Sequence, residues 1–535
     1  MQRSLVVLLL FVLTAIASRG AILYVDASAT NPVPPYASWS TAATNIQDAL
    51  DDATAGDEVD VANGLYATAL PAGSFGLTVN QGVLLQSVNG PQSTFVDCGG
   101  TNAGANLADD ALLSGFTLTN GRFWGVYSQA SNAVVSNCVI AGFFPVEEGP
   151  FASGAQGVTL YNCVLSNNTN YGYGGGAANC TLSNCTLIGN RSLFTTQGRP
   201  TPCYGGGAYN CVLTNCTLVG NYCYMDGGGA GGSMLLNCLV VSNSCQGGGA
   251  GCAGCTVNNS TLAGNYSDLV GGGAAYSTLD NCLVVSNSCQ DSGGGCWGCT
   301  NSGCTLIGNS DGADGNQLNN CIVYDNIGLD YYPQTEMDYC CVPTMPTNGV
   351  GNITNAPLFV DPAGGNFRLQ ANSPCINAGN DAYVVGSTDL DGDPRIVGGT
   401  VDIGAYEYQT PVSMISYAWL QQYGLPISTN VDATDPDGSG MNAYQDWIAG
   451  LNPTNALSVL KMTSAAKTNN PAGLVVTWES VNTRTYYLQS STNLAGQPAF
   501  STVRSNIVGQ AGTTSYTDTT ATNAGPYFYR VGVRN

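Results

Sequence analysis

The chain has 535 residues, of which 35 are acidic and only 13 are basic, and it contains no histidine. A formal net charge of −22 repels polyanions, so the composition excludes nucleic acid as a partner. The lack of histidine excludes histidine-dependent triads and metal sites, and lysine occurs only at Lys461 and Lys467. At this length we expect more than one domain, although a solenoid can extend further as a single unit.

Residues 1–20 have the pattern of a secretory signal peptide. Arg3 supplies the positive start, an apolar run covers 5–16, and Ala15 and Ala17 frame a small-residue cleavage site. No later stretch approaches the roughly 18 apolar residues that a membrane span requires. We therefore expect a secreted protein, extracellular or on a bacterial cell surface, with no membrane span.

A six-residue motif such as Cys185-Thr-Leu-Ile-Gly-Asn190 repeats through the middle of the chain. Successive copies start 22, 31, 22, 22, 22 and 22 residues apart. Self-similarity at a fixed period predicts a solenoid. The copies begin at Cys163, Cys185, Cys216, Cys238, Ser260, Cys282 and Cys304.

Each copy alternates apolar and polar residues over a few positions and then meets Gly, Asn or Ser, which is typical of short strands and turns. Leucine-rich repeats would need several leucines and a helical segment per unit, which these copies lack. The predicted fold is all-β: a right-handed single-stranded parallel β-helix.

Residues kept in register between coils should form columns along the axis, about 4.8 Å apart. The motif asparagines should form one such ladder and satisfy backbone groups in the turns. They are Asn168, Asn190, Asn221, Asn243, Asn265, Asn287, Asn309 and Asn326.

Most of the 22 cysteines also follow the repeat, in three columns. Neighbours in a column are close enough for a disulfide, yet the columns contain gaps such as Ser233, Ser260 and Ser277, and cysteine is also a good small core residue. Both vertical disulfides and buried stacks of thiols fit this pattern.

Motifs at both ends of the region 21–408 carry a family resemblance. The start has a strand at 22–26, an amphipathic segment at 46–50 and a further strand in 56–66; the end has Ser373-Pro-Cys-Ile-Asn-Ala-Gly379, Asp389-Leu-Asp-Gly-Asp-Pro-Arg395 and Val401-Asp-Ile-Gly-Ala-Tyr-Glu-Tyr408. This region resembles bacterial exported β-helix proteins of the pectate-lyase-like superfamily, ending in a choice-of-anchor Q domain. The resemblance implies a capped solenoid and a surface location, and it names no substrate.

The alternating acids Asp389, Asp391 and Asp393 in that end motif allow two interpretations. Acids spaced in this way can bind calcium, but Pro394 stands where a calcium loop turns on glycine. A turn held by pairing with arginine fits equally well.

After a linker at 409–416, residues 417–455 form a predicted EF-hand-like module: a short helix, an acidic loop and a second helix. Residues 435–446 match a twelve-residue calcium loop, with glycine at the sixth position. The predicted Ca²⁺ ligands are Asp435, Asp437, Ser439, the backbone carbonyl of Met441 and Asp446.

Aspartate at the last position of the loop, where glutamate is usual, predicts modest affinity. The module resembles dockerin-like or thrombospondin-type-3-like calcium motifs. The alternative is an acidic helix-loop-helix without metal. Residues 456–535 alternate polar and apolar in short runs, which predicts a β-sandwich similar to fibronectin type III.

The coils lack a familiar catalytic set. Lyases need an arginine or lysine base beside acidic calcium ligands, and glycoside hydrolases need paired carboxylates. The bases in the repeat region are Arg122, Arg191 and Arg199, and Asp226 and Asp291 adjoin glycine turns of different coils. We therefore expect a non-catalytic surface protein that binds extracellular polysaccharide or cell-surface glycan, or is structural; the alternative is a polysaccharide lyase or glycoside hydrolase.

Overall fold

A computed structural model describes residues 20–67, 71–130, 132–145, 154–194, 202–469 and 471–534. The predicted signal peptide lies outside these residues, apart from Gly20. By its contacts the chain forms two compact units. The first holds the coils up to Thr300 together with Leu306–Gln317 and Asp325–Thr335, and the second holds Asn301–Thr305, Leu318–Tyr324 and everything from Glu336 onward. The predicted boundaries at 408, 416 and 455 stay predictions.

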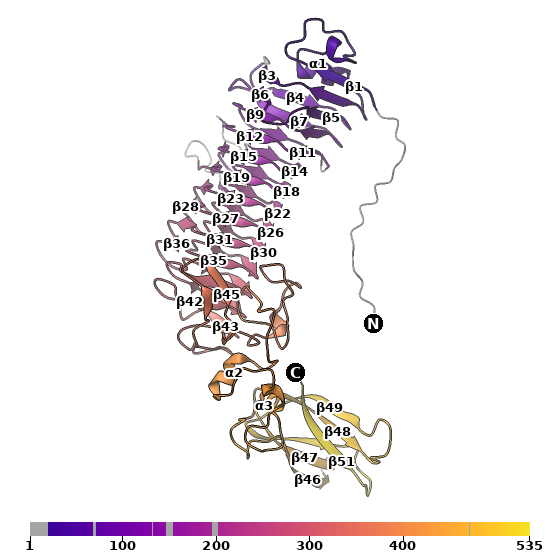
Figure 1. Cartoon of the computed structure of the whole chain (residues 1–535), viewed down its shortest axis with the longest axis vertical. Helices are drawn as coiled ribbons and strands as arrows, with labels where there is room; N and C mark the ends of the chain where they lie inside the picture. The colour runs from indigo at the N-terminus through magenta and orange to yellow at the C-terminus, as the bar shows by residue number, and fades with distance from the viewer. Residues whose placement is uncertain are drawn as a thin grey trace. The chain divides into compact units, whose positions relative to one another are not determined.

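The body of the chain is a parallel β-helix, as predicted. Each coil contributes one short strand to each of several parallel sheets, and the strands stack along the coil axis (Figure 1). Within the described residues the largest sheet has 14 strands. In spatial order they are β1 (Ile22–Val25), β2 (Glu58–Val61), β5 (Leu84–Ser87), β8 (Leu112–Ser114), β11 (Val134–Ser136), β14 (Thr159–Tyr161), β18 (Thr181–Ser183), β22 (Val212–Thr214), β26 (Met234–Leu236), β30 (Thr256–Asn258), β34 (Thr278–Asp280), β38 (Thr300–Ser302), β41 (Gln317–Asn319) and β43 (Glu336–Asp338).

A second sheet has 12 strands in the part of the chain that the structure describes, and it follows the first after one tight corner in each coil. Its strands are β3 (Gly64–Ala67), β6 (Thr94–Asp97), β9 (Thr117–Thr119), β12 (Val139–Ala141), β15 (Val164–Ser166), β19 (Thr186–Ile188), β23 (Thr217–Val219), β27 (Leu239–Val241), β31 (Thr261–Ala263), β35 (Leu283–Val285), β39 (Thr305–Ile307) and β42 (Ile322–Tyr324).

The third sheet, with 11 described strands, precedes the first sheet in each coil and is called the platform sheet below. It comprises β4 (Phe75–Val79), β7 (Ala103–Leu107), β10 (Val126–Tyr127), β13 (Ala155–Gln156), β17 (Ala177–Ala178), β21 (Ala208–Tyr209), β25 (Ala230–Gly231), β29 (Cys252–Ala253), β33 (Ala274–Ala275), β37 (Cys296–Trp297) and β40 (Ala313–Asp314).

Six two-residue strands form a shorter parallel sheet within the described residues. They are β16 (Thr169–Asn170), β20 (Arg191–Ser192), β24 (Tyr222–Cys223), β28 (Ser244–Cys245), β32 (Tyr266–Ser267) and β36 (Ser288–Cys289). The first coil is covered by α1 (Ile46–Asp52), which begins at the N-cap Asn45 and buries Ile46, Ala49 and Leu50. This capping helix was predicted, and η1 (Trp39–Thr41) precedes it.

In the interior, equivalent residues of successive coils stack on one another and form columns along the axis. Leu182 pairs with Leu213 in register, Leu187 pairs with Leu218, and all four side chains are fully buried. Burying one such leucine stabilises the fold by about 1.5 to 3 kcal/mol. The corners between strands need left-handed backbone, which asparagine and glycine tolerate; Asn184, for example, has a φ of 54°.

The predicted asparagine ladder is present. Asn221 donates from its backbone nitrogen and its Nδ2 to Oδ1 of Asn243, both at 2.9 Å, and the same pair of bonds links each motif asparagine to the next. Each Nδ2 also donates to a carbonyl of the preceding coil, such as that of Leu187. Asp330 ends the ladder by accepting from Asn326. These side chains therefore satisfy buried corner groups and are structural.

All 22 cysteines lie in described residues, none of them forms a disulfide, and all but Cys289 are buried. The backbone nitrogen of Cys163 donates to Sγ of Cys185 at 3.4 Å, so the cysteine column does the same work as the asparagine column. The gaps follow the same chemistry, because Ser260 Oγ accepts from the nitrogen of Cys238 at 2.9 Å and Ser233 Oγ from that of Cys211 at 3.0 Å. Of the two interpretations left open by the sequence, the structure has the stacked thiols.

The second unit contains the remaining elements. They are the hairpin β44 (Phe359–Asp361) and β45 (Asn366–Leu369), the helices η2 (Asp381–Tyr383), α2 (Tyr417–Gln422), η3 (Val431–Ala433) and α3 (Ala443–Ala449), and the strands β46 (Met462–Asn469), β47 (Ala472–Ser480), β48 (Thr485–Ser491), β49 (Ser501–Val508), β50 (Gly512–Asp518) and β51 (Phe528–Arg534).

The last six strands form two antiparallel sheets, β46-β47-β50 and β49-β48-β51. Their shared core contains Val476 and Trp478 from one sheet and Tyr486 and Leu488 from the other, which is the small β-sandwich predicted. No helix among the described residues is long and apolar enough to cross a membrane.

Candidate functional sites

The outward face of the platform sheet carries aromatic residues in a single column. The register places one residue per coil: Asn106, Tyr127, Gln156, Ala178, Tyr209, Gly231, Ala253, Ala275, Trp297 and Asp314. Tyr127, Tyr209 and Trp297 are three and four coils apart, which is about 14 and 19 Å at one strand spacing per coil. The three positions between Tyr209 and Trp297 carry Gly231, Ala253 and Ala275, and of these Gly231 and Ala275 are buried. The aromatic residues are therefore separate stations along the column.

Each of these three residues is the centre of a larger aromatic group. Tyr209 lies with its ring centroid 4.6 Å from that of Tyr173 and 6.3 Å from that of Tyr204, and Tyr173 stacks on Tyr204 with an interplanar angle of 13°. Trp297 meets the exposed Tyr276 edge to face at 4.7 Å. The rings come from turns of neighbouring coils, so the parallel register builds the groups.

The group at Tyr127 is the largest. Phe75 stacks on Trp124 at 5.8 Å and on Tyr127 at 6.0 Å, and Trp124 lies 4.9 Å from Tyr127. Trp124 Nε1 donates to Oε1 of Gln156 at 2.9 Å, so a polar side chain borders the rings. We call the groups at Tyr127, Tyr209 and Trp297 the aromatic column. Stacked half-buried rings beside an amide can pack against the apolar faces of sugar rings.

No motif in the sequence marks these aromatic residues as one group. Tyr209 and Trp297 are 88 residues apart, a multiple of the 22-residue period, so that pair could have been found. Tyr127 precedes Tyr209 by 82 residues, which is no multiple, because loops interrupt the earlier coils. Only the strand register places all three in one column.

The predicted calcium-loop residues lie together in the second unit. The backbone nitrogens of Gly438 and Gly440 both donate to the carboxylate of Asp435 at 2.9 Å, and that of Ser439 donates to Asp437 at 3.0 Å. These bonds lower the pKa of Asp435 below its ordinary value. Met441, the fourth of the five predicted ligand residues, donates its backbone nitrogen to Ser439 Oγ at 3.3 Å.

Asp446 lies in the first turn of α3, whose capping box joins Asn442 and Gln445. Its side chain is fully buried, and neither of its carboxylate oxygens has a hydrogen-bond partner. Oδ2 of Asp437 is also buried without a hydrogen-bond partner. Burial, followed by the charges of Asp437 and Asp435, raises the pKa of Asp446 to about 6. Such a buried, unpartnered acid is costly without a counter-charge.

The loop has the right ligand atoms for a cation, but they are not close enough together to bind one as they stand. The donor set is all oxygen, which suits a hard cation such as Ca²⁺. Among the described residues, however, no three His, Cys, Asp or Glu side chains converge closely enough to form a metal cluster. Binding would therefore require Asp435, Asp437 and Asp446 to draw together.

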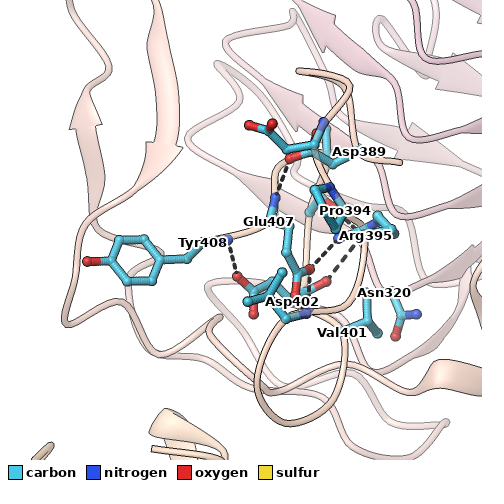
Figure 2. Close-up of polar contacts among 12 residues, drawn as sticks. Asn320, Asp389, Pro394, Arg395, Val401, Asp402, Glu407 and Tyr408 are labelled. Carbon is cyan, nitrogen blue, oxygen red and sulfur yellow. Dashed lines mark hydrogen bonds and ion pairs between the residues drawn. The ribbon is translucent and has the colours of Figure 1, made fainter. Parts of the chain in front are cut away.

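The end motif forms a buried acid–arginine cluster, shown in Figure 2. Arg395 Nη1 pairs with Glu407 Oε2 at 2.9 Å, with both side chains almost fully buried, and Arg395 Nη2 donates to the carbonyls of Asp402 and Gly404. Asp389 accepts from the nitrogen of Glu407 at 2.9 Å. Burial raises the pKa of Glu407 to about 9 and that of Asp402 to about 7, although Arg395 opposes both shifts.

The oxygens of this cluster are used for holding loops. Asp402 accepts from the nitrogens of Asn377 and Tyr408, both at 2.7 Å, and joins segments that are distant in sequence. Asp391 pairs with Arg368. Of the two interpretations of the Asp389–Asp393 motif, the structure therefore has the arginine-paired turn, and the cluster has the character of a structural clamp.

The coil acids weighed as catalytic candidates are turn residues in the structure. Asp226 Oδ1 accepts from the nitrogen of Gly248 at 2.6 Å, which fixes the next coil's glycine turn. Asp291 is exposed, and its nitrogen donates to the carbonyl of Leu269. Arg122 and Arg191 lie over the rings of Phe123 and Tyr222. Arg199 lies outside the described residues.

Comparison with known proteins agrees with this architecture. Residues 81–232 match a family model described as a right handed beta helix region. No curated protein matches the chain. The match lies within the stacked parallel sheets, so the coils form a right-handed parallel β-helix.

Solved structures similar to the chain include pectate lyase Pel9A, at 14% identity over 73% of this chain and 97% of that one, with a TM-score of 0.33. The A-module of the Azotobacter vinelandii mannuronan C-5 epimerase AlgE6 is 15% identical over 58% of this chain and 95% of that one, with a TM-score of 0.28. The PL6 family alginate lyase AlyGC is 12% identical over 59% and 53%, also with a TM-score of 0.28. These likenesses concern the fold and carry no inference about activity.

Proposed function

We propose that this protein is an exported, non-catalytic surface protein whose β-helix binds an extended glycan along the aromatic column. The observation that carries the proposal is the alignment of Tyr127, Tyr209 and Trp297 on one outward column, spanning about 34 Å at one strand spacing per coil. Sugar rings offer apolar C–H faces to such rings and hydroxyl groups to side chains such as Gln156.

The absence of catalysis is part of the proposal. Asp226 uses a carboxylate oxygen to hold a neighbouring turn, and Arg122 and Arg191 each lie over an aromatic ring. A lyase would need an arginine base beside acidic groups, and a hydrolase would need paired carboxylates flanking the scissile bond. Export and a surface location rest on residues 1–20 and on the resemblance of the end motif to the choice-of-anchor Q domain.

A glycan panel tests this proposal. The purified chain is titrated with neutral and acidic oligosaccharides while reducing ends and unsaturated sugars are measured. We expect binding without new products, weakened about tenfold or more by Tyr209→Ala and Trp297→Ala. Met234→Ala is the matched control, because Met234 is 56% exposed on the 14-stranded sheet. Cleavage products, or equal loss in the control, would contradict the proposal.

We further propose that the loop Asp435–Asp446 binds one Ca²⁺ through Asp435, Asp437, Ser439, Met441 and Asp446. The support is the buried Asp446, whose two oxygens lack any partner, next to an unpartnered oxygen of Asp437. A divalent cation would compensate these charges, and the affinity expected for an aspartate at the last position is modest.

Calorimetry with CaCl₂ tests the loop. The wild type should bind one ion per chain, and Asp435→Ala and Asp446→Asn should weaken binding at least about tenfold. Asp52→Ala, at an exposed position at the end of α1, controls for the loss of one surface charge. Identical isotherms for the wild type and Asp435→Ala would refute the calcium proposal and leave the glycan proposal standing.

A further inference from the structure

One turn at the aromatic column is built to hold three side chains at the surface. It runs from Gly121 to Gly125. A Cβ at Gly121 would lie 2.2 Å from a ring carbon of Phe143, and one at Gly125 would lie 2.2 Å from Ile140 Cγ2. Only glycine lets the backbone approach the core this closely at both ends. The side chains between them, from 122 to 124, remain half-exposed.

The backbone of this turn is fixed on both sides. The nitrogen of Arg122 donates to the carbonyl of Asn102 at 2.7 Å, and the nitrogen of Gly104 donates to the carbonyl of Trp124 at 2.8 Å. Phe123 has a φ of 72°, a left-handed conformation that is unfavourable for a bulky residue. Such strain persists only where the surroundings hold it, and it is found most often at binding sites.

Arg122 is an unpaired cation in a strongly acidic chain. Its Nε is buried without a hydrogen-bond partner, and no ion pair involves its guanidinium within the described residues. Its guanidinium carbon lies 5.6 Å from the Phe123 ring centroid. By contrast, Arg368 pairs with Asp391 and Arg395 with an interior glutamate. Unsatisfied buried donors are rare and call for an explanation such as a bound anion.

The aromatic rings beside Arg122 form a surface on which a sugar ring can pack. Phe123 and Trp124 have centroids 6.1 Å apart, and Trp124 continues into the stack with Phe75 and Tyr127. An arginine next to stacked rings combines recognition of a carboxylate with packing against an apolar ring face. This is the only station of the column where an unpaired arginine joins the aromatic group among the described residues.

We propose that Arg122, Trp124, Phe75 and Tyr127 bind a single carboxylate-bearing sugar within an otherwise neutral glycan. The inference rests on the proposed glycan binding and specifies one station of it. A uronate carboxylate accepts from the Arg122 guanidinium while its sugar ring packs on Trp124. We expect a polyuronate to bind less tightly, because the chain's net charge of −22 repels a ligand with an acid on every sugar.

Saturation-transfer NMR tests the site with three small probes, methyl glucoside, methyl glucuronide and methyl glucoside 6-sulfate, and with the polymer polygalacturonate as a competitor. We expect the glucuronide to bind about tenfold or more tighter than the glucoside, and tighter than the sulfate and the polygalacturonate. Arg122→Gln should remove the preference for the glucuronide while retaining glucoside binding. Trp124→Ala should also remove the preference for the glucuronide and should weaken glucoside binding, with the groups at Tyr209 and Trp297 retaining the remainder.

Arg191→Gln is the matched control, since Arg191 also lies over a ring, that of Tyr222 at 5.4 Å, but outside the column. It should retain the preference. If Arg122→Gln keeps the preference for the glucuronide, or if the wild type binds the sulfate or the polygalacturonate more tightly than the glucuronide, the uronate site at Arg122 is refuted. The proposed glycan binding would still stand. Failure of the wild type to bind any glycan in the panel would instead overturn the proposed function.

Discussion

Replacing one rung of the asparagine ladder should destabilise the coils far more than its size suggests. In Asn243, Oδ1 accepts from the nitrogen and Nδ2 of Asn221, and Nδ2 donates to the carbonyls of Leu218 and Val241 and to Oδ1 of Asn265. Asn243→Ala leaves two to three buried groups without partners. At about 1 to 3 kcal/mol for each, the loss is about 2 to 9 kcal/mol.

Urea unfolding of the first unit, followed by circular dichroism, measures this loss, and hydrogen exchange at the Asn221 amide locates it. Thr256→Ser, on the exposed face of β30, is the control and should change the free energy of unfolding by less than about 0.5 kcal/mol. If Asn243→Ala unfolds within about 0.5 kcal/mol of the wild type, the ladder is not what satisfies these corners.

Three further outcomes follow from the buried polar groups. Arg395→Met should destabilise the second unit by about 3 to 5 kcal/mol in urea unfolding, because Glu407 and the carbonyls of Asp402 and Gly404 lose their buried hydrogen-bond donor. The pKa values of about 9 for Glu407 and about 7 for Asp402 exceed those of the unfolded chain, so the native state binds more protons than the unfolded chain. The free energy of unfolding should therefore fall as pH rises from about 4 to 9, and Glu407→Gln should make this decrease smaller. A free energy of unfolding that rises over this pH range would contradict the prediction. Cys185→Ser should retain more stability in urea unfolding than Cys185→Ala, since the serine hydroxyl still accepts from the nitrogen of Cys163. Alkylation in denaturant without reductant, followed by mass spectrometry, should find all 22 thiols modified.

The repeat made the fold predictable. A fixed 22-residue period with strand-like alternation leaves few architectures, and the ladder asparagines follow directly from stacking identical coils. The cysteine columns were harder, because a pattern with gaps at Ser233 and Ser260 left both vertical disulfides and buried thiols open. The structure explains the gaps, since a serine hydroxyl accepts the same corner hydrogen bond as a thiol.

The candidate sites were only partly predictable. The loop 435–446 is contiguous, so its acids could be chosen by spacing, but the burial of Asp446 depends on how α3 packs. The aromatic column joins residues from coils whose loops differ in length, and the unpaired state of Arg122 is a property of its surroundings. Neither the alignment of the aromatic column nor the unpaired state of Arg122 can be predicted from the spacing of residues in the sequence.

A crystal structure of the protein with a bound oligosaccharide from the glycan panel tests the central claim most directly. The account predicts an intact glycan lying along the platform sheet, with sugar rings packed on Tyr209 and on the group at Tyr127. A cleaved or unsaturated sugar in the electron density, or a glycan bound over the 14-stranded or 12-stranded sheet instead, would contradict it.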